Sequence, residues 1–296
     1  MRHTKRPVVD IITAIPEVAS LARETVRLHP RRGGRPTHQS KIGGQFLWPA
    51  GEEWPLCKEH QSPLITVLQL TAEDVPELGF PQGKDLFQLL WCPNDHQALQ
   101  PIYAPASRVF WRKRSQIKEC LGEPPPPNSA EEHYCPAPCV VYPERVTEYP
   151  DAFEVSDSLP ELWSKIEFSE VLAKAIESIA DFDFDAPETL YQYWLSVADG
   201  TKVRGYPNWI QDPETPQCKC GAEMEYLLTI ASTELDGGTW GRWLAEEDRH
   251  VWGASYEERN AVQCAAGLML GDMGNINFFI CRKCAGWPIA SVFQCS

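Results

Sequence analysis

Eight cysteine and histidine side chains occur in pairs whose short spacing suits metal binding. Each half of the chain holds two such pairs. Two short-spaced pairs that a hairpin brings together complete a tetrahedron of sulfur and nitrogen ligands, the coordination that zinc prefers. We therefore predict two zinc ions, held by Cys57, His60, Cys92 and His96 in the first half and by Cys218, Cys220, Cys281 and Cys284 in the second.

Both predicted zinc sites are structural rather than catalytic, because four protein ligands leave no position for water. The Cys218-x-Cys220 step is tighter than the usual zinc knuckle, so Cys264 is an alternative to Cys220 as the fourth ligand. The alternative to metal binding is that these are buried thiols and surface histidines, since an isolated cysteine often acts as a small hydrophobic residue.

A basic stretch interrupts an otherwise acidic chain. The segment RLHPRRGGRPTHQSK, residues 27–41, contains glycines and prolines that favour an open loop. Such a loop can grip a phosphate, another anion or an acidic partner surface. We assign this role to Arg31, Arg32, Arg35 and Lys41. The alternative is a solvated loop whose charges balance nearby carboxylates.

The other potentially reactive residues give weaker signals. One of them is the segment HYCPAPC, which contains His133, Cys135 and Cys139. It is compatible with two interpretations, a third metal or redox site and ordinary packing. The sequence has no Gly-x-Ser-x-Gly motif, no phosphate-binding glycine loop before Lys-Ser or Lys-Thr, and no His-Glu-x-x-His motif. A catalytic interpretation has no anchor, so we expect a protein that is not an enzyme.

The chain contains an internal repeat. Residues 41–58, KIGGQFLWPAGEEWPLCK, align with residues 202–219, KVRGYPNWIQDPETPQCK, with Lys, Gly, Trp, Pro and Cys coinciding at one constant offset. Two further pairs of strand-like apolar runs also align, 64–70 with 224–230 and 85–96 with 272–284. We expect each half to form a related β unit with equivalent metal ligands.

The second copy carries an insertion at about residues 239–268, rich in tryptophan and charge. Tryptophan is enriched among the residues that dominate binding energy at interfaces. We therefore place a partner surface at Trp240, Trp243 and Trp252. The alternative is that these side chains pack in a core.

The predicted fold class is α+β and β-rich, with two duplicated antiparallel β units with zinc-knuckle hairpins, an N-terminal helix and a pair of central helices. The N-terminal helix covers residues 15–28, where apolar residues follow one helical face. The central helices lie between about 159 and 200. We divide the chain into residues 1–150, the N-terminal helix and first repeat, and 151–296, a helical connector and the second repeat, as parts of one compact fold.

Charge and composition limit the classes of partner. Forty-one acidic and twenty-seven basic side chains leave a net charge of -14, which repels phosphate backbones and attracts basic proteins. No apolar run approaches the length of a membrane span, and the N-terminus lacks the pattern of a secretion signal. We expect a cytoplasmic protein whose eleven cysteines are reduced and available to bind metal.

The repeated motifs resemble those of the bacterial YwqG family, a domain of unknown function. The resemblance is carried by SKIGGQFLWP, LITVLQL and FQLLWC in the first half and by KVRGYPNWIQ, CKCGAEM and GDMGNINFFICRKC in the second. That family is grouped with programmed-cell-death-protein-type and Tsr-type proteins in a duplicated superfamily called the TYPP domain. The resemblance implies a β-rich fold of two related halves and, in some members, zinc at cysteine pairs. His60 and His96 stand where the family pattern has cysteine.

The same resemblance implies several functions, because the eukaryotic relatives act as chaperones for a ribosomal protein, RNA-processing roles are proposed for the group, and bacterial members are suspected immunity proteins. We predict a non-catalytic, zinc-stabilised module that captures a basic partner protein, either a toxin or a newly made client. The alternative is an RNA-associated or RNA-processing factor that uses the basic loop at 27–41. A zinc hydrolase would require one site to exchange a protein ligand for water.

Overall fold

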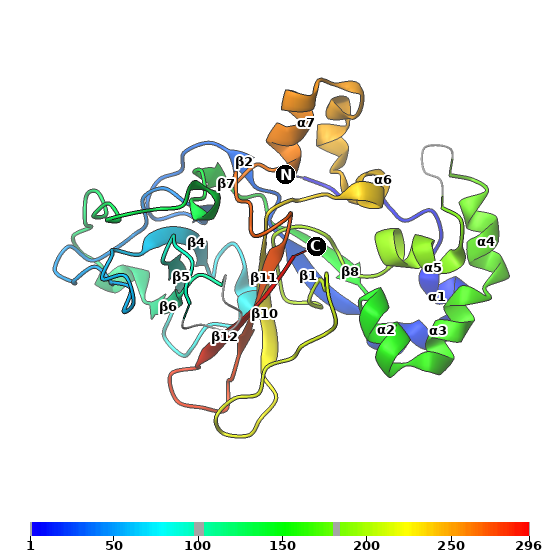
Figure 1. Cartoon of the computed structure of the whole chain (residues 1–296), viewed down its shortest axis with the longest axis horizontal. Coiled ribbons are helices and arrows are strands. Elements are labelled where there is room, and N and C mark those ends of the chain that lie inside the picture. The colour runs from blue at the N-terminus through cyan, green and yellow to red at the C-terminus, as the bar shows by residue number, and fades with distance from the viewer. Residues whose placement is uncertain (1, 98–103, 180–183, 296) are drawn as a thin grey trace.

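Two antiparallel β-sheets form the centre of the molecule (Figure 1). The structure, a computed structural model, describes residues 2–97, 104–179 and 184–295. The first sheet has the order β6 (Ser107–Arg112), β5 (Leu86–Trp91), β4 (Ile65–Thr71), β3 (Lys41–Ile42), β7 (Cys139–Val140) and β2 (Arg31–Arg32). The second has the order β12 (Ile289–Gln294), β11 (Asn275–Ile280), β10 (Glu225–Ala231), β9 (Lys202–Val203), β1 (Arg23–Arg27) and β8 (Glu144–Glu148). The predicted α+β fold with two antiparallel β units is confirmed.

The two sheets share the same irregularity as well as the same strand order. The β4–β5 and β10–β11 hairpins both shift register just before equivalent leucines, Leu68 and Leu228. The carbonyl oxygen at the skipped position, Val67 in one half and Leu227 in the other, accepts a backbone N–H at 2.9 Å in both. A β-bulge at the same place in both hairpins is what a duplicated unit predicts.

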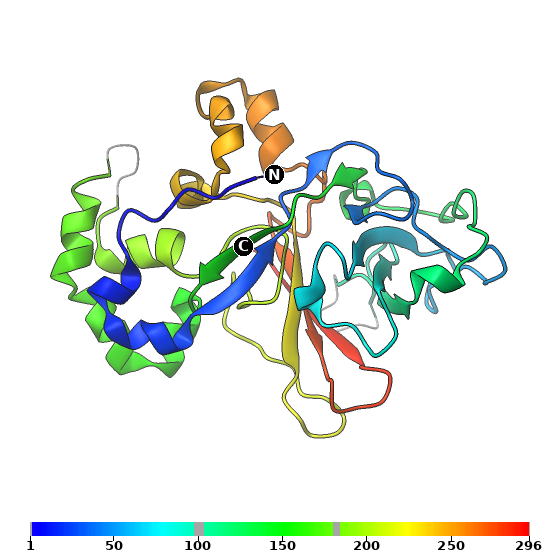
Figure 2. The same cartoon turned by 180° about the vertical axis from the view of Figure 1, so that it is seen from behind.

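At two points along the chain, consecutive strands pair in different sheets. β1 leads into β2 along the chain, yet it pairs with β8 and β9 in the second sheet. β7 leads into β8, yet it pairs with β2 and β3 in the first sheet. Figure 2 shows β1 and β8 side by side. The first sheet is therefore formed by one continuous part of the sequence, residues 31–140, whereas the second combines β1 with the strands from β8 onward.

One cluster of buried apolar side chains joins the two sheets. It includes Val67 and Phe87 from the first sheet and Leu227 and Phe278 from the second, all at most 1% exposed. Burial of this apolar surface is the main favourable contribution to folding. The two sheets are therefore held together by a shared core as well as by the chain connections from β1 to β2 and from β7 to β8.

The N-terminal segment differs from the single helix predicted over 15–28. The structure has a short α1 (Ile11–Ala14), a 3-10 turn at Pro16–Leu21 and then β1, so the prediction of helix was wrong beyond the turn. β1 carries the β-branched residues Thr25 and Val26 and is paired on both edges. Sheet pairing on both sides outweighs a local helical periodicity.

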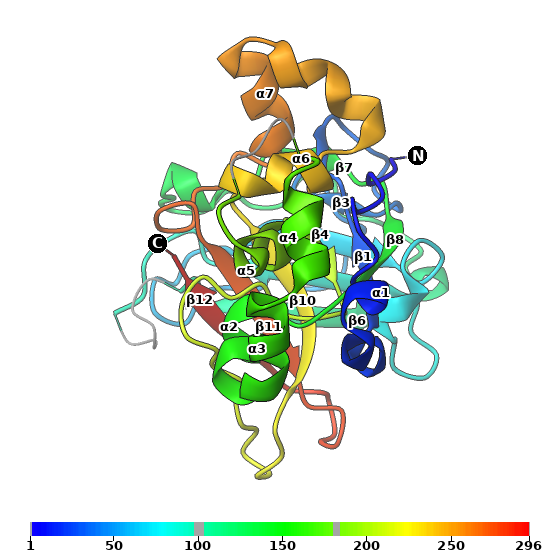
Figure 3. The same cartoon turned by 90° about the vertical axis from the view of Figure 1, so that its right-hand side faces the viewer.

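The helices gather in two places. The group around the central connector comprises α2 (Ala152–Ser158), α3 (Pro160–Glu167), α4 (Glu170–Ile176) and α5 (Pro187–Leu190), with a π-helical turn at Tyr191–Leu195. Figure 3 looks onto this group, which shares a separate small core with α1. The first predicted central helix corresponds to α3 and α4, which are separated where Ser169 caps α4. The second corresponds to α5 and the π-helical turn. Residues 180–183 lie outside the described residues.

The insertion of the second half forms the other helical group, with α6 (Trp240–Trp243) and α7 (Tyr256–Gln263). Figure 1 shows α7 standing apart from the sheets at the top of the view. Short 3-10 turns complete the described elements, at Pro76–Leu78, Arg114–Gln116, Glu132–Tyr134, Gly237–Thr239 and Glu246–Gly253.

Two candidate Cys/His metal centres

A tight turn presents the first ligand pair of each half. Cys57 N–H donates to Ser62 O, and Cys218 N–H donates to Ala222 O, both at 2.8 Å. Each turn closes on an isolated β-bridge that leads into β4 or β10. The turn of the first half is one residue longer, in agreement with the alignment of the two copies. The ligand pair is thus positioned by the start of a sheet strand.

The second ligand pair follows the neighbouring strand. Cys92 and Cys281 come directly after β5 and β11, and each donates its N–H to a backbone carbonyl at 3.0 Å. In each hairpin the end of this strand lies beside the start of its partner, as with Trp91 and Ile65. The hairpin therefore brings the two ligand pairs together.

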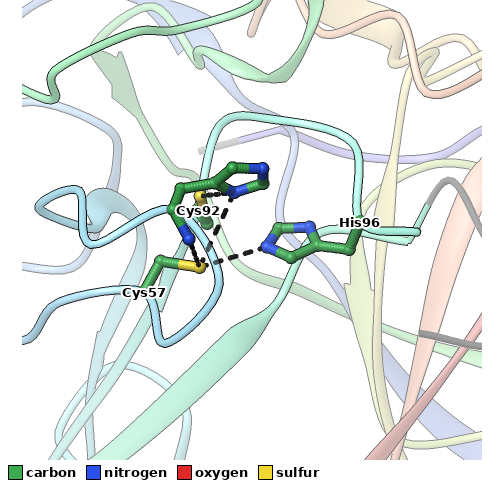
Figure 4. Close-up of side chains that lie close together, drawn as sticks. Cys57, Cys92 and His96 are labelled. Carbon is green, nitrogen blue, oxygen red and sulfur yellow. Dashed lines mark hydrogen bonds between the residues drawn. The ribbon is translucent and has the colours of Figure 1, made fainter. Parts of the chain in front are cut away.

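In the first half all four predicted ligands converge. Cys57 Sγ lies 3.2 Å from His96 Nε2 and 3.7 Å from His60 Nδ1, and Cys92 Sγ lies 3.4 Å from His60 Nδ1. Figure 4 shows Cys57, Cys92 and His96 pointing toward one another. With zinc bonds of ~2.3 Å to sulfur and ~2.0 Å to nitrogen, tetrahedral angles place the two ligand atoms about 3.5 Å apart. The separations fit a tetrahedral metal ion.

The second half brings four thiols together. Cys218 Sγ lies 3.7 Å from Cys284 Sγ, and Cys220 Sγ lies 3.7 Å from Cys281 Sγ. Tetrahedral coordination by thiolates separates sulfurs by about 3.8 Å, whereas a disulfide requires ~2.05 Å. All eleven cysteines lie within the described residues and none forms a disulfide. The fourth thiol of the group is that of Cys220, and Cys264 is not among them.

The pKa values of two ligands favour the form that binds metal, and that of a third does not. Burial lowers the pKa of His96, which favours the neutral imidazole that binds metals. The backbone N–H of Ala222 lowers the pKa of Cys220 to about 7. Burial raises the pKa of Cys92 to about 11, so this thiolate needs a neighbouring cation. A bound metal ion would supply that charge.

The structure does not assemble the third group as the sequence suggested. His133 lies with Asp95 and Glu131 rather than with Cys135 and Cys139. Cys139 is 1% exposed in the main core, and its Sγ donates to a backbone carbonyl at 3.3 Å. Cys139 therefore packs in the core, while Cys135, whose Sγ donates to Glu131 O at 3.6 Å, lies beside the cluster of imidazole and carboxylates without belonging to it.

The basic loop divides into buried and exposed cations. Lys41 is 2% exposed, and its Nζ donates to the carbonyl oxygens of Arg35 at 2.7 Å and Gln45 at 3.0 Å. Arg31 forms an ion pair with Asp248 of the insertion. Of the four residues assigned to anion binding, Arg32 and the guanidinium of Arg35 keep their charge at the surface.

The three tryptophans of the insertion occupy different environments. Trp243 is 1% exposed, and its Nε1 donates to Tyr193 O at 2.9 Å. Trp240 and Trp252 meet edge to face with ring centroids 6.2 Å apart, and Trp252 is 41% exposed. Trp243 therefore belongs to a core, while Trp252 remains at the surface.

A buried ion pair joins the second repeat to β8. Lys202 and Glu148 are both 0% exposed, and Lys202 Nζ lies 3.0 and 2.9 Å from the two carboxylate oxygens. The carboxylate also accepts the backbone N–H groups of Ala198 at 2.7 Å and Tyr206 at 2.5 Å. Lys202 is the counterpart of Lys41 in the repeat, so the alignment could have singled it out. Its partner lies 54 residues away, and no local pattern predicts it.

An acidic pocket of about 240 Å³ lies between the connector and the second repeat. This acidic pocket is lined by three carboxylates. Asp151 is 4% exposed and Asp199 is 9% exposed, whereas Asp236 is exposed to solvent. Burial raises the pKa of Asp151 to about 7 and that of Asp199 to about 6. The sequence reasoning missed this pocket, because its carboxylates come from separate segments.

Asp151→Asn is expected to alter how stability depends on pH. The folded-state pKa of Asp151, about 7, lies above the unfolded value of ~3.9, so the folded state holds the proton more tightly. Stability contributed by this group is present below pH ~4 and is lost as pH rises through about 7. Because one pKa unit corresponds to ~1.4 kcal/mol, the loss is at most about 4 kcal/mol.

Asparagine keeps an oxygen to cap α2 through Phe153 N–H, now 2.9 Å from the carboxylate, but it does not titrate. The free energy of unfolding should be measured in urea between pH 5 and pH 8. As pH rises, the value for the variant should increase relative to the value for the wild type. Asp157→Asn, at an exposed position of α2, is the matched control. Parallel pH curves for wild type and Asp151→Asn would contradict the assignment.

These features define the class of protein: an internally duplicated α+β fold with a Cys/His cluster in each half that can hold a metal ion. The chain belongs to the family described as "Domain of unknown function (DUF1963)", whose sequence profile matches residues 40–283. No curated protein matches the chain. Among the residues that the structure describes, no helix combines the length and apolar character needed to cross a membrane.

Proposed function

We propose that this chain is a non-catalytic, zinc-stabilised module that binds a basic partner protein. The observation that carries the proposal is that both clusters are complete. Each offers four cysteine or histidine ligands whose donor atoms lie within 4.8 Å of one another, which leaves no open position at which a metal ion could activate water. Zinc suits this donor set, because thiolate and imidazole are its preferred ligands in tetrahedral sites.

The charge of the chain supports a protein partner. A net charge of -14 favours encounter with a basic surface and disfavours nucleic acid. A cognate toxin and a newly made client protein are both partners of this kind. The proposal keeps the resemblance to the YwqG family and the TYPP superfamily, which implies partners of both kinds.

The basic loop gives less support to the RNA-binding alternative. A grip on phosphate needs several accessible cations, but Lys41 is buried against backbone carbonyls and Arg31 is paired with Asp248. We therefore keep RNA as an outcome of the test rather than as a second proposal.

Affinity purification of the tagged chain from its native cells, with and without ribonuclease, tests the proposed function. We expect one basic protein in near-stoichiometric amount, released at high salt because a Debye length of ~3 Å at 1 M screens charged contacts. Elemental analysis should find about two zinc ions per chain, one for each four-ligand cluster. Recovery of RNA in place of a basic protein, or a fully folded protein without zinc, would contradict the proposal.

A further inference from the structure

In the first half of the molecule, a segment after β6 fills the space between β6 and the loop that follows β3. Two backbone hydrogen bonds, of 2.7 and 3.0 Å, join residues 119–122 to residues 48–50. The side chain of Leu121 packs in an apolar cluster that also contains Trp48 and, from β6, Phe110. We call residues 119–122 the filling segment.

The equivalent space in the second half is an open groove of about 920 Å³ between β12 and residues 210–216. Trp209 stands where the repeat alignment places Trp48, and Val292 of β12 occupies the register position of Phe110. Both belong to the apolar cluster of the second half. No segment within the described residues takes the position of the filling segment here. The groove thus has the apolar wall but not the covering chain.

The loop wall of the groove is fixed without an occupant. The side-chain oxygen of Gln294 accepts the N–H groups of residues 210 and 211 at 2.9 and 3.1 Å, and its amide donates to Asp212 O at 3.0 Å. In the first half the equivalent strand position is Arg112, which holds the corresponding loop through Glu52 at 2.6 and 2.7 Å. A wall that is already ordered lowers the entropy cost of binding.

β12 presents an unpaired strand edge to the groove. It is the outermost strand of its sheet, and its register with β11 is regular throughout. In an antiparallel pair, every second residue of an edge strand turns its N–H and C=O groups away from the neighbouring strand. The hydrogen bond from Cys281 N–H to Pro288 O shows that Ser291 and Phe293 are among the residues of β12 whose groups point away from β11. Within the described part of the chain these groups have no hydrogen-bond partner. Such an edge can add an extended peptide as a further strand.

The charge around the groove indicates a basic occupant. Asp212 and Glu214 line it and are not fully buried. The acidic pocket adjoins it, since Phe153 and Ile210 line both. An occupant that carries lysine or arginine beside an apolar residue would satisfy the carboxylates and cover the apolar wall together.

We propose that the groove between residues 210–216 and β12 binds an extended, lysine- or arginine-bearing segment of the partner protein, in the place that the filling segment takes in the first half. This assignment rests on the proposed partner-binding function and names its surface. The bound segment pairs with the edge of β12, packs an apolar side chain against Val292 and directs a basic side chain toward the acidic pocket.

A synthetic peptide tests the groove directly. The probe is a fluorescent peptide that copies residues 116–123, with both glutamates replaced by lysine and the cysteine by serine. Titration with the whole chain, followed by fluorescence anisotropy, should show saturable binding. Asp212→Lys combined with Glu214→Lys should weaken the binding about tenfold or more, because two attractive charges become repulsive. Ser291→Pro should also weaken it, since it removes an outward N–H at an edge position that tolerates proline.

The matched control is Glu161→Lys combined with Glu170→Lys, an equal change of charge at exposed positions of the helical connector. Retained binding by this control, with loss in the groove variants and unchanged circular dichroism, supports the assignment. Equal loss in both double variants, or no binding by the wild type, overturns it. If wild type and groove variant capture the same cellular partner equally, the partner-binding function stands and the groove assignment fails. If the peptide binds the groove but no basic partner is captured, the proposed function fails instead.

Discussion

Cys281→Ser is expected to release one of the two zinc ions that we propose and to lower the free energy of unfolding by several kcal/mol, the range seen for loss of a structural metal. Cys281 is 2% exposed and lies in an apolar cluster with Trp209 and Met224. Without the ion, that cluster loses the link that joins the turn at Cys218 to the end of β11. The sheets keep their shared core, so the loss is smaller than in a zinc finger, which is unfolded without its metal.

Elemental analysis and urea denaturation measure the two effects on the same preparation. Cys295→Ser is the matched control, because this half-buried thiol belongs to neither cluster; it should retain both ions and nearly all of the stability. His60→Ala should release the ion of the first half alone. A Cys281→Ser protein that still binds two zinc ions would refute the second site.

Glu148→Ala is expected to destabilise the fold by about 3–5 kcal/mol, because removal of one member of a buried pair leaves the other charge unpaired. Lys202 is 0% exposed, so water cannot replace the lost carboxylate. The site is also tightly packed: a Cβ added at Gly205, where φ is +79°, would lie 2.0 Å from Glu148 Oε1. The repeat has glycine at the matching position, Gly44, where φ is +67°.

The exposed pair of Glu225 and Arg204 provides the comparison for this second prediction. Glu225→Ala should cost no more than about 1 kcal/mol, the usual value of a surface ion pair. The double variant Glu148→Gln, Lys202→Met should recover part of the loss of Glu148→Ala, because no charge is then left unpaired. Urea denaturation at neutral pH gives all three values. Equal costs for Glu148→Ala and Glu225→Ala would show that the buried pair is not essential.

The metal clusters and the central hairpins could be predicted from the sequence because their signals are local. Cys57 and Cys92 recur as Cys218 and Cys281 at the mouths of matching strands. The strands themselves are strongly apolar runs, which a sheet covered on both faces requires. Pairing of adjacent strands then follows from chain order, so the ligands could be placed together without a structure.

Local signals misled where tertiary contacts decided the outcome. Residues 22–28 have a helical periodicity, yet β1 gains pairing on both edges. Trp243 was placed at a partner surface but packs in a core, because tryptophan serves both environments equally well. His133 lies with Asp95 and Glu131, and Asp95 comes from a separate segment and donates its N–H to the Glu131 carboxylate at 3.2 Å.

The amino-acid sequence by itself determined that the protein is duplicated, β-rich and acidic, and which side chains form each Cys/His cluster, because these properties depend on residue types at short or repeated spacing. The pairing of β1 and β8 in the second sheet, the burial of Lys202 against Glu148, and the open groove beside β12 were decided by the tertiary structure. Each depends on which distant segments meet, and that is settled by the packing of the whole chain around its shared core.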